Sequence, residues 1–187
     1  VGLSPKTIVE KGISMSFIPE DRLGMGLAPS MSITDNMILK KYANSRGPFV
    51  DRKTGRADAE EVIRELEVVT PSADTPVRRL SGGNVQKVLV GREIASAPAV
   101  LMTAYAVRGL DIGASYTIYN LLNKQKKNGV AVIFVGEDLD VLLELCDRIL
   151  VINSGAVTGL VDARTATKEE IGLLMTKTDA AGEEAAQ

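Results

Sequence analysis

The sequence predicts an α/β fold built on a parallel sheet, because three short apolar runs alternate with helical patterns. The runs are Ala99–Ala104, Val130–Val135 and Arg148–Ile152, and none of them alternates between apolar and polar residues. Continuous apolarity is typical of strands that are buried on both faces, as in a parallel sheet. Residues 114–129 and 138–146 place apolar side chains at helical spacing between the runs. The order is therefore strand, helix, strand, helix, strand.

The front half of the chain predicts one further strand followed by helices. Met15–Pro19 is a candidate strand. Ser32 or Thr34 is expected to cap a helix that runs to about Tyr42. Arg56–Val69 is amphipathic, with apolar residues along one helical face.

A short strand and a last helix are expected near the end of the chain. Val157–Val161 follows an Asn-Ser-Gly turn, and Thr167–Met175 has acidic residues in its first turn. Small and acidic residues follow, which predicts a disordered tail. The boundaries that we expect for the partial domain 1–178 are a mostly helical subdomain over 32–96, an α/β core over 12–20 and 97–178, and a tail over 179–187.

Composition excludes several classes of function. With 187 residues, of which 45% are hydrophobic and 25% charged, the chain fits one soluble domain or a core with a small subdomain. A net charge of −2 and an aromatic content of 4% argue against a nucleic-acid partner. No apolar run approaches the roughly 20 residues that span a bilayer. Histidine is absent, which removes histidine-based nucleophilic triads and HExxH zinc sites.

The stretch "LSGGNVQK" is the strongest local candidate for a binding site. Ser81, Gly82 and Gly83 precede a helical run, and the start of a helix offers unpaired N–H groups and a partial positive charge to a phosphate. Glycine lets a ligand approach the backbone closely. Taken alone, the three residues are equally well explained as an ordinary helix cap.

Four motifs in a fixed order favour the binding site over the ordinary helix cap. They are "IPEDRLGMGL" (Ile18–Leu27), "LSGGNVQK" (Leu80–Lys87), "RGLDIGA" (Arg108–Ala114) and "LCDRI" (Leu145–Ile149). The set resembles the second nucleotide-binding domain of the tandem ATP-binding subunits of bacterial ABC importers, and most of all those for simple sugars and nucleosides. The resemblance covers about residues 4–175.

The resemblance implies a partial RecA-like P-loop NTPase core with a helical ABC signature subdomain. It implies that the signature loop binds an ATP held by the P-loop of the opposite domain, and that the D-loop crosses the interface between the two domains. Glu20 takes the place of the Q-loop glutamine, which senses the membrane domain in that family. The residues assigned to the partner's ATP are Ser81, Gly82, Gly83, Asn84 and Gln86, and Asp111 belongs to the D-loop.

Several departures from the family pattern concern hydrolysis. No GxxxxGK[ST] P-loop occurs, and because the chain starts at Val1 without a methionine we expect it to be a fragment or processed product. The strand before the D-loop should end in two acids, one for Mg²⁺ and one to polarise water, but these positions hold Ala104 and Tyr105. The switch histidine is replaced by Glu137. We expect no intact catalytic residue and no metal ligand in the chain.

Simpler structural roles remain open for individual residues. Asp111 is also a favourable acid at a helix start, and both roles are compatible. For Glu137, we favour a solvated acid beside a helix capped by Asp138 over a substitute for the catalytic histidine. The simpler explanation for Glu20 and its neighbours Asp21 and Arg22 is a surface turn with a local ion pair. Cys146, the only cysteine, is expected to be a small core residue.

The expected function is that of a component in a transporter. The resemblance implies ATP and Mg²⁺ as cofactors of the intact protein, with neither bound tightly by this fragment. It implies a partner nucleotide-binding domain, transmembrane permease subunits and, indirectly, a lipoprotein that binds the solute, at the cytoplasmic face of the bacterial membrane. The alternatives are a soluble ABC-type ATPase and a non-catalytic structural or regulatory module.

Overall fold

The computed structural model describes residues 2–41 and 50–177. They fall into two compact units, Val1–Val135 and Gly136–Gln187, and each unit is described by itself. The end of the first predicted helix, at Tyr42, and the predicted tail lie outside the described residues. Among the residues that are described, no helix is long and apolar enough to cross a bilayer.

A three-stranded parallel sheet forms the centre of the first unit. Its strands are β1 (Met15–Ile18), β2 (Val100–Ala104) and β3 (Ala131–Val135), in the order β1-β2-β3. Ile18 pairs with Thr103 and Thr103 with Phe134, so all three strands end at the same edge. The predicted parallel α/β arrangement is confirmed.

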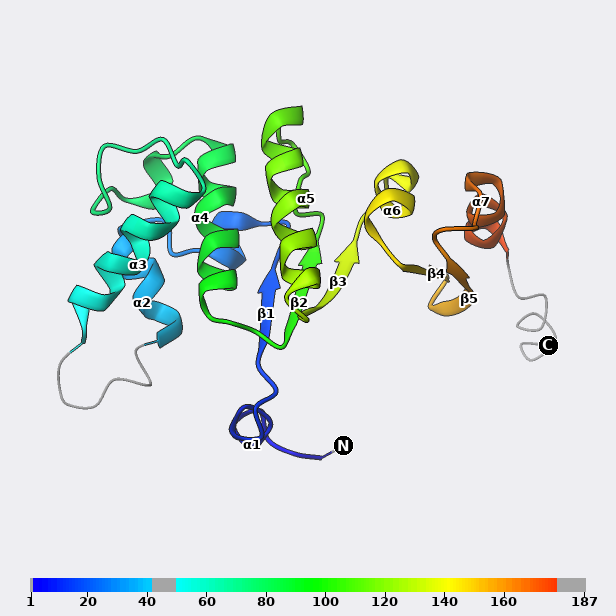
Figure 1. The fold of residues 1–187 in the computed structure, drawn as a ribbon, viewed down its shortest axis with the longest axis horizontal. Coiled ribbons are helices and arrows are strands. Elements are labelled where there is room, and N and C mark those ends of the chain that lie inside the picture. Colours follow the sequence, from blue (N-terminus) through cyan, green and yellow to red (C-terminus); the bar gives the residue numbers. More distant parts are fainter. Residues whose placement is uncertain (1, 42–49, 178–187) are drawn as a thin grey trace, which may run out of the picture. The chain divides into compact units, whose positions relative to one another are not determined.

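The described segment between β1 and β2 consists of helices joined by turns and loops. It contains a π-helical turn, η1 (Arg22–Gly26), and a 3₁₀ turn, η3 (Val77–Arg79), while α1 (Pro5–Glu10) precedes β1. Figure 1 shows its three α-helices grouped on one side of this unit. They are α2 (Ile33–Lys41), α3 (Arg52–Glu65) and α4 (Gly82–Ala95).

Short polar side chains set where these helices begin. Ser32 caps α2, because its Oγ accepts a hydrogen bond from the Asp35 amide at 3.0 Å. Asp51 caps α3 through hydrogen bonds from the Lys53 and Thr54 amides. This cap explains why α3 starts four residues before the predicted Arg56: a good capping residue extended the helix beyond its apolar pattern.

One face of the sheet is covered by α4 and α5 (Ile112–Lys127), which pack on β1 and β3 respectively. Ser16, Ile18 and Leu101 point to this covered face and are buried. On the opposite face, Met15 is 63% and Ile133 is 49% exposed. The apolar runs correctly predicted strands, but only one face of the sheet is covered by α4 and α5 in the described structure.

Helices α3 and α4 approach each other closely at Gly91. A Cβ on Gly91 would lie 2.5 Å from Cγ1 of Val62 and 3.1 Å from Cδ1 of Leu66. Glycine is needed here because no side chain fits between the two helices.

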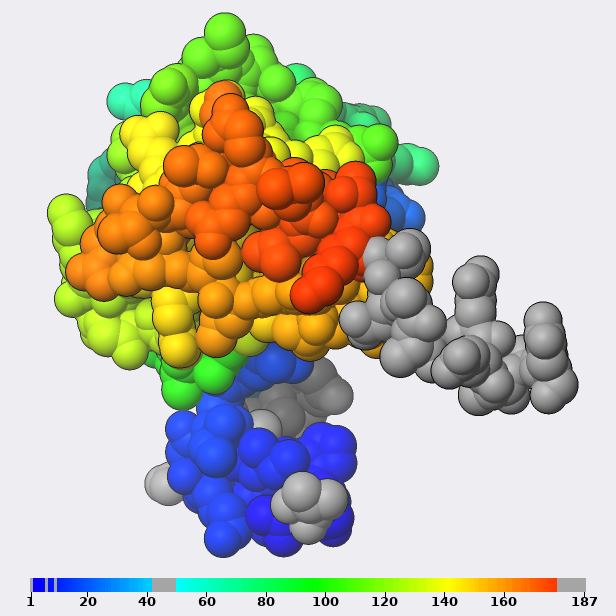
Figure 2. All heavy atoms as spheres, turned by 90° about the vertical axis from the view of Figure 1, so that its right-hand side faces the viewer, coloured from blue at the N-terminus to red at the C-terminus, as the bar shows by residue number. Residues whose placement is uncertain are grey.

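The second unit is a β-hairpin packed with two helices. It contains α6 (Leu139–Leu145), β4 (Arg148–Asn153), β5 (Ala156–Asp162) and α7 (Lys168–Thr176), which starts at the Thr167 cap. In Figure 2, the red residues of α7 lie beside the orange residues of the hairpin. The predicted last strand and last helix are confirmed.

The prediction that Arg148–Ile152 extends the parallel sheet is wrong. β4 pairs antiparallel with β5 across a Ser154-Gly155 turn, with Leu150 opposite Leu160. Ile149 and Val151 are buried against the helices, whereas Leu150 is 52% exposed. A continuous apolar run therefore formed a strand with only one buried face in this unit, because its tight turn favours a hairpin.

Replacing Gly91 by alanine tests the close packing of α3 and α4. We expect Gly91→Ala to lower the free energy of unfolding by about 1–3 kcal/mol, because Val62 is stiff at χ1 and must shift. The matched control is Gly172→Ala in α7, where a Cβ meets no atom within 4 Å. That change should stabilise by up to about 1 kcal/mol through helix propensity. Urea unfolding measures both, and equal effects of the two substitutions would contradict the packing argument.

Candidate functional site

The start of α4 exposes the groups that the sequence predicted. Ser81 is the N-cap residue, with extended backbone, but its side chain makes no capping hydrogen bond to the helix. The first-turn N–H groups of a helix have no intrahelical partner, so those of α4 point outward. Ser81 and Gly82 are exposed, and Gly83 is half-buried. This arrangement suits a phosphate oxygen.

Asn84 holds the Ser81 side chain in place. Its Nδ2 donates to Ser81 Oγ at 2.9 Å, and its Oδ1 accepts from the Val69 amide at 2.9 Å. One turn further along, Lys87 Nζ donates to the Glu67 carbonyl at 3.1 Å. These bonds fix the connection that follows α3 onto the first turn of α4. Asn84 therefore belongs to the signature motif and also holds its Ser81 side chain in place.

Gln86 lies inside the fold. It is 0% exposed, and neither Nε2 nor Oε1 has a hydrogen-bond partner among the described residues. A buried amide without partners is costly and rare. In this conformation Gln86 offers no atom to a ligand outside the fold, unlike Ser81 and Gly82.

A second cluster joins the turns that follow β1 and β2. Arg22 Nη2 donates to the carbonyl of Arg108, and Arg108 Nη1 pairs with Glu20 Oε1 at 2.7 Å. A Cβ on Gly82 would lie 3.4 Å from Arg22 Nη1, so this guanidinium also reaches the start of α4. Partial burial lowers the pKa of Arg22, and the charge of Glu20 opposes this shift. The structure thus brings the "PEDR" turn, the "RGLD" turn and the signature loop together.

The two positions expected to hold acids come at the end of β2. Ala104 is its last residue, and Tyr105 follows with a left-handed backbone, φ 51°. The Tyr105 amide donates to the Val135 carbonyl at 2.9 Å, and the Arg108 guanidinium lies 5.9 Å from the Tyr105 ring centroid. Mg²⁺ requires oxygen ligands, usually carboxylates, and a methyl group offers none. These residues do not fit a magnesium site.

Asp111 acts as the N-cap of α5. Its Oδ1 accepts from the Ala114 amide at 2.8 Å, and the residue is exposed. The capping role considered from the sequence is therefore present. Because a carboxylate has further lone pairs, the cap leaves Asp111 able to make a second contact.

Glu137 belongs to the second unit. It is exposed, and it precedes Asp138, which caps α6 by accepting from the Asp140 amide at 3.0 Å. The predicted cap is confirmed. Within residues 2–41 and 50–177, no group of three or more acidic or cysteine residues is placed to hold a metal ion.

Arg108 is the residue at this site that sequence reasoning missed. Its position directly before "GLD" was visible, but its pairing with Glu20 spans 88 residues of sequence. The usable signal was topological: parallel neighbouring strands end at one edge, so the turns after β1 and β2 must meet.

Comparisons with known proteins agree with the fold and the motifs. No family model matches the chain. The xylose import ATP-binding protein XylG of Moorella thermoacetica is 38% identical over 157 residues, which are 84% of this chain and 31% of that protein. The ribose import ATP-binding protein RbsA of Bacillus subtilis is 37% identical over 174 residues, 92% of this chain and 35% of that protein.

Solved structures show the same fold at low sequence identity. The dimeric post-hydrolysis state of the ATP-binding cassette MJ0796, bound to ADP and phosphate, has a TM-score of 0.72 at 23% identity. The match covers 88% of this chain and 70% of that one. CbiO1 of Clostridium perfringens, part of an ABC transporter complex, has a TM-score of 0.67 at 22% identity and covers 90% and 65%. The chain thus has the fold of an ABC ATPase cassette, is homologous to the ATP-binding proteins of ABC sugar importers, and spans about a third of the length of these relatives.

Proposed function

We infer that the chain is part of the ATP-binding subunit of an ABC importer for simple sugars or nucleosides. The named relatives import ribose or xylose, which supports a small sugar as the transported solute. The proposal implies a cytoplasmic position against transmembrane permease subunits, with a lipoprotein supplying the solute from outside. A soluble ABC-type ATPase is not favoured, because these relatives are import proteins.

The observation that carries the proposal is the open start of α4. The hydroxyl of Ser81 is held by Asn84 and does not cap the helix, so it and the first-turn amides can all donate toward one phosphate. We infer that this phosphate is the γ-phosphate of an ATP carried by a partner cassette. Asn84 would contribute to phosphate binding by orienting the Ser81 hydroxyl. Gln86 is buried, so it could contact the phosphate only if α4 rearranged.

This chain's own side chains provide little for hydrolysis. ATP hydrolysis needs Mg²⁺ to neutralise developing charge and a group that orients the attacking water. Ala104 offers no ligand, and the phenol of Tyr105 is a poor base that already lies beside Arg108. Glu137 has no proton to donate as a carboxylate. We infer that the ATP site containing these positions does not hydrolyse ATP.

One ion pair and one hydrogen bond at the strand ends would connect the start of α4, which is half of the proposed ATP site, to the Glu20 turn and the D-loop. Glu20 at the Q-loop position is tied through Arg108 to the turn that carries Asp111. Arg22 links the same turn to the start of α4. A permease that displaced the Glu20 turn would therefore act on both the D-loop and the signature loop.

The substitution Ser81→Arg tests the half-site in the full-length transporter. A long cationic side chain should fill the position of the phosphate and remove the hydroxyl donor. We expect the rate of ATP hydrolysis to fall at least about tenfold, which corresponds to about 1.4 kcal/mol of transition-state stabilisation. Release of phosphate by the transporter in membrane vesicles measures the change.

The control is Ser154→Arg, in the exposed turn between β4 and β5. It introduces the same side chain into the same protein, but in the second unit and outside the signature loop. Full ATPase activity in the Ser81→Arg protein would refute the half-site proposal.

Binding of nucleotide by the 187-residue chain alone is a separate test. We expect isothermal titration with Mg-ATP to give no measurable binding in the micromolar range, because the chain has neither a P-loop nor magnesium ligands at Ala104 and Tyr105. A dissociation constant of about 1 µM, or about −8.2 kcal/mol, would show that a nucleotide site exists within these residues.

A further inference from the structure

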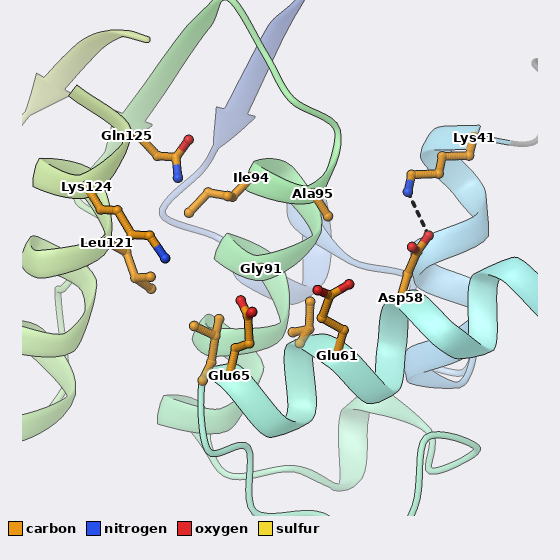
Figure 3. A pocket seen from close by; sticks show the side chains of 12 residues that line it. Lys41, Asp58, Glu61, Glu65, Gly91, Ile94, Ala95, Leu121, Lys124 and Gln125 are labelled. Carbon is orange, nitrogen blue, oxygen red and sulfur yellow. Dashed lines mark hydrogen bonds and ion pairs between the residues drawn. The ribbon is translucent and has the colours of Figure 1, made fainter. Parts of the chain in front are cut away.

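A groove lies between α3, α4 and α5, away from the residues discussed so far. Its volume is about 230 Å³, and Figure 3 shows side chains from all three helices turned toward it. Val62 and Leu66 of α3, Ile94 of α4 and Leu121 of α5 give it an apolar lining. Space of this size, with an apolar lining, suits one long side chain or a small ligand.

The charges around the groove are unbalanced. Lys41 and Asp58 form an ion pair at one end, with Nζ and Oδ2 2.7 Å apart. Glu61 and Glu65 lie one helical turn apart on α3, and both point into the groove in Figure 3. Neither carboxylate has a hydrogen bond or ion pair within the described part of the chain. Across the groove, the ammonium group of Lys124 is likewise unpaired there, so the lining carries one excess negative charge.

Gln125 supplies an independent indication of a ligand. Only 9% of this residue is exposed, and its side-chain amide has no hydrogen bond among the residues that the structure describes. Figure 3 shows the amide turned from α5 toward Ile94, on the side of the groove. Its amide atoms are not among the fully buried atoms without a partner, so the amide remains accessible to a group that enters the groove. The amide can both donate and accept.

We propose that this groove binds the arginine side chain of a partner polypeptide. The guanidinium group would lie between Glu61 and Glu65 and donate to the Gln125 carbonyl oxygen, while its apolar stem packs on Leu66 and Leu121. Its charge would neutralise the lining. An arginine fits better than a metal ion, because the free carboxylates come from only two residues and the apolar side chains can pack on the arginine stem.

The groove is separate from the ATP half-site. Its lining comes from α3 and from the later parts of α4 and α5, whereas Ser81 and Asp111 stand at the beginnings of α4 and α5. Since the partner is recognised through α3, α4 and α5 together, its binding would restrain the packing of the helical segment on the rest of the first unit. The proposal does not depend on the ATP chemistry.

A pair of peptides tests it on the 187-residue chain. The first is acetyl-Leu-Ala-Arg-Ala-Leu-amide, and the second carries neutral citrulline in place of arginine. We expect the arginine peptide to shift the NMR signals of the Gln125 side-chain amide and the Leu121 methyl groups, with a dissociation constant of about 0.1–1 mM. The citrulline peptide should bind at least about tenfold more weakly, a difference of about 1.4 kcal/mol.

Variants locate the effect. The double substitution Glu61→Gln with Glu65→Gln should remove the preference for arginine over citrulline. The matched control, Glu60→Gln, alters an acid on the same helix that pairs with Arg56 and does not line the groove. Unchanged circular dichroism melting confirms that each variant is folded.

Three outcomes of the peptide experiments would overturn the proposal. They are no shift at Gln125 or Leu121 with the arginine peptide, equal binding of the citrulline peptide, and a preference for arginine that survives in the double variant. Agmatine, a small guanidinium compound without a peptide backbone, distinguishes a polypeptide from a small-molecule ligand. Binding of agmatine as tight as that of the peptide would exclude a polypeptide as the specific partner.

Discussion

The parallel pairing of β1 with β2 is the constraint on which the rest of the site depends. Because parallel neighbours end at one edge, the turns that follow Ile18 and Ala104 are forced together, although their contact between Glu20 and Arg108 spans 88 residues of sequence. The helical segment inserted between these strands must then leave at that edge and return to the opposite one, where β2 begins beside Met15. Its last helix, α4, packs on β1, and the start of that helix lies within reach of Arg22. The sheet thus positions a binding loop that is not itself part of the sheet.

A buried charged network holds α4 to this framework. Arg92 donates through Nε and Nη2 to Glu93 Oε1, and its Nη2 also donates to the Gly26 carbonyl at 2.6 Å. The other carboxylate oxygen of Glu93 lies 2.8 Å from Lys40 Nζ on α2. Ser16 of β1 donates to the Glu93 carbonyl at 3.0 Å. One residue pair of α4 therefore contacts α2, η1 and β1.

Such a network favours one arrangement over alternatives more than it adds stability. Burying charges carries a desolvation cost that can cancel the attraction between them, whereas removing one partner typically costs about 3–5 kcal/mol. Displacing α4 relative to η1 would break the bond from Arg92 to the Gly26 carbonyl, and displacing it relative to β1 would break the bond from Ser16 to the Glu93 carbonyl. The start of α4, at the other end of this helix, is consequently held in a defined place.

The sequence predicted the strands and the signature helix because their signals are local. Apolar runs, glycines and capping residues report on their own neighbourhood, which is why β1–β3, α4 and the caps at Asp138 and Asp111 could be anticipated. The same local signal misassigned β4, since apolarity does not say which partner a strand will pair with. The Glu20–Arg108 pair and the buried amide of Gln86 were not predictable from spacing, because both are products of tertiary contacts between distant segments. The assignment of ATP contacts came from the resemblance and stays a prediction.

The residues at the end of β2 and those at the start of α4 are held by different sets of contacts. Ala104 and Tyr105 end a strand, and the groups around them are backbone bonds to β3 and the ring contact with Arg108. Ser81 and Gly82 are supported by Asn84 and by the buried Arg92–Glu93 pair that holds α4. Arg22 joins the two places, because it donates to the carbonyl of Arg108 and lies beside Gly82. The end of β2 and the start of α4 thus have largely different supports and share one connection through Arg22 and Arg108.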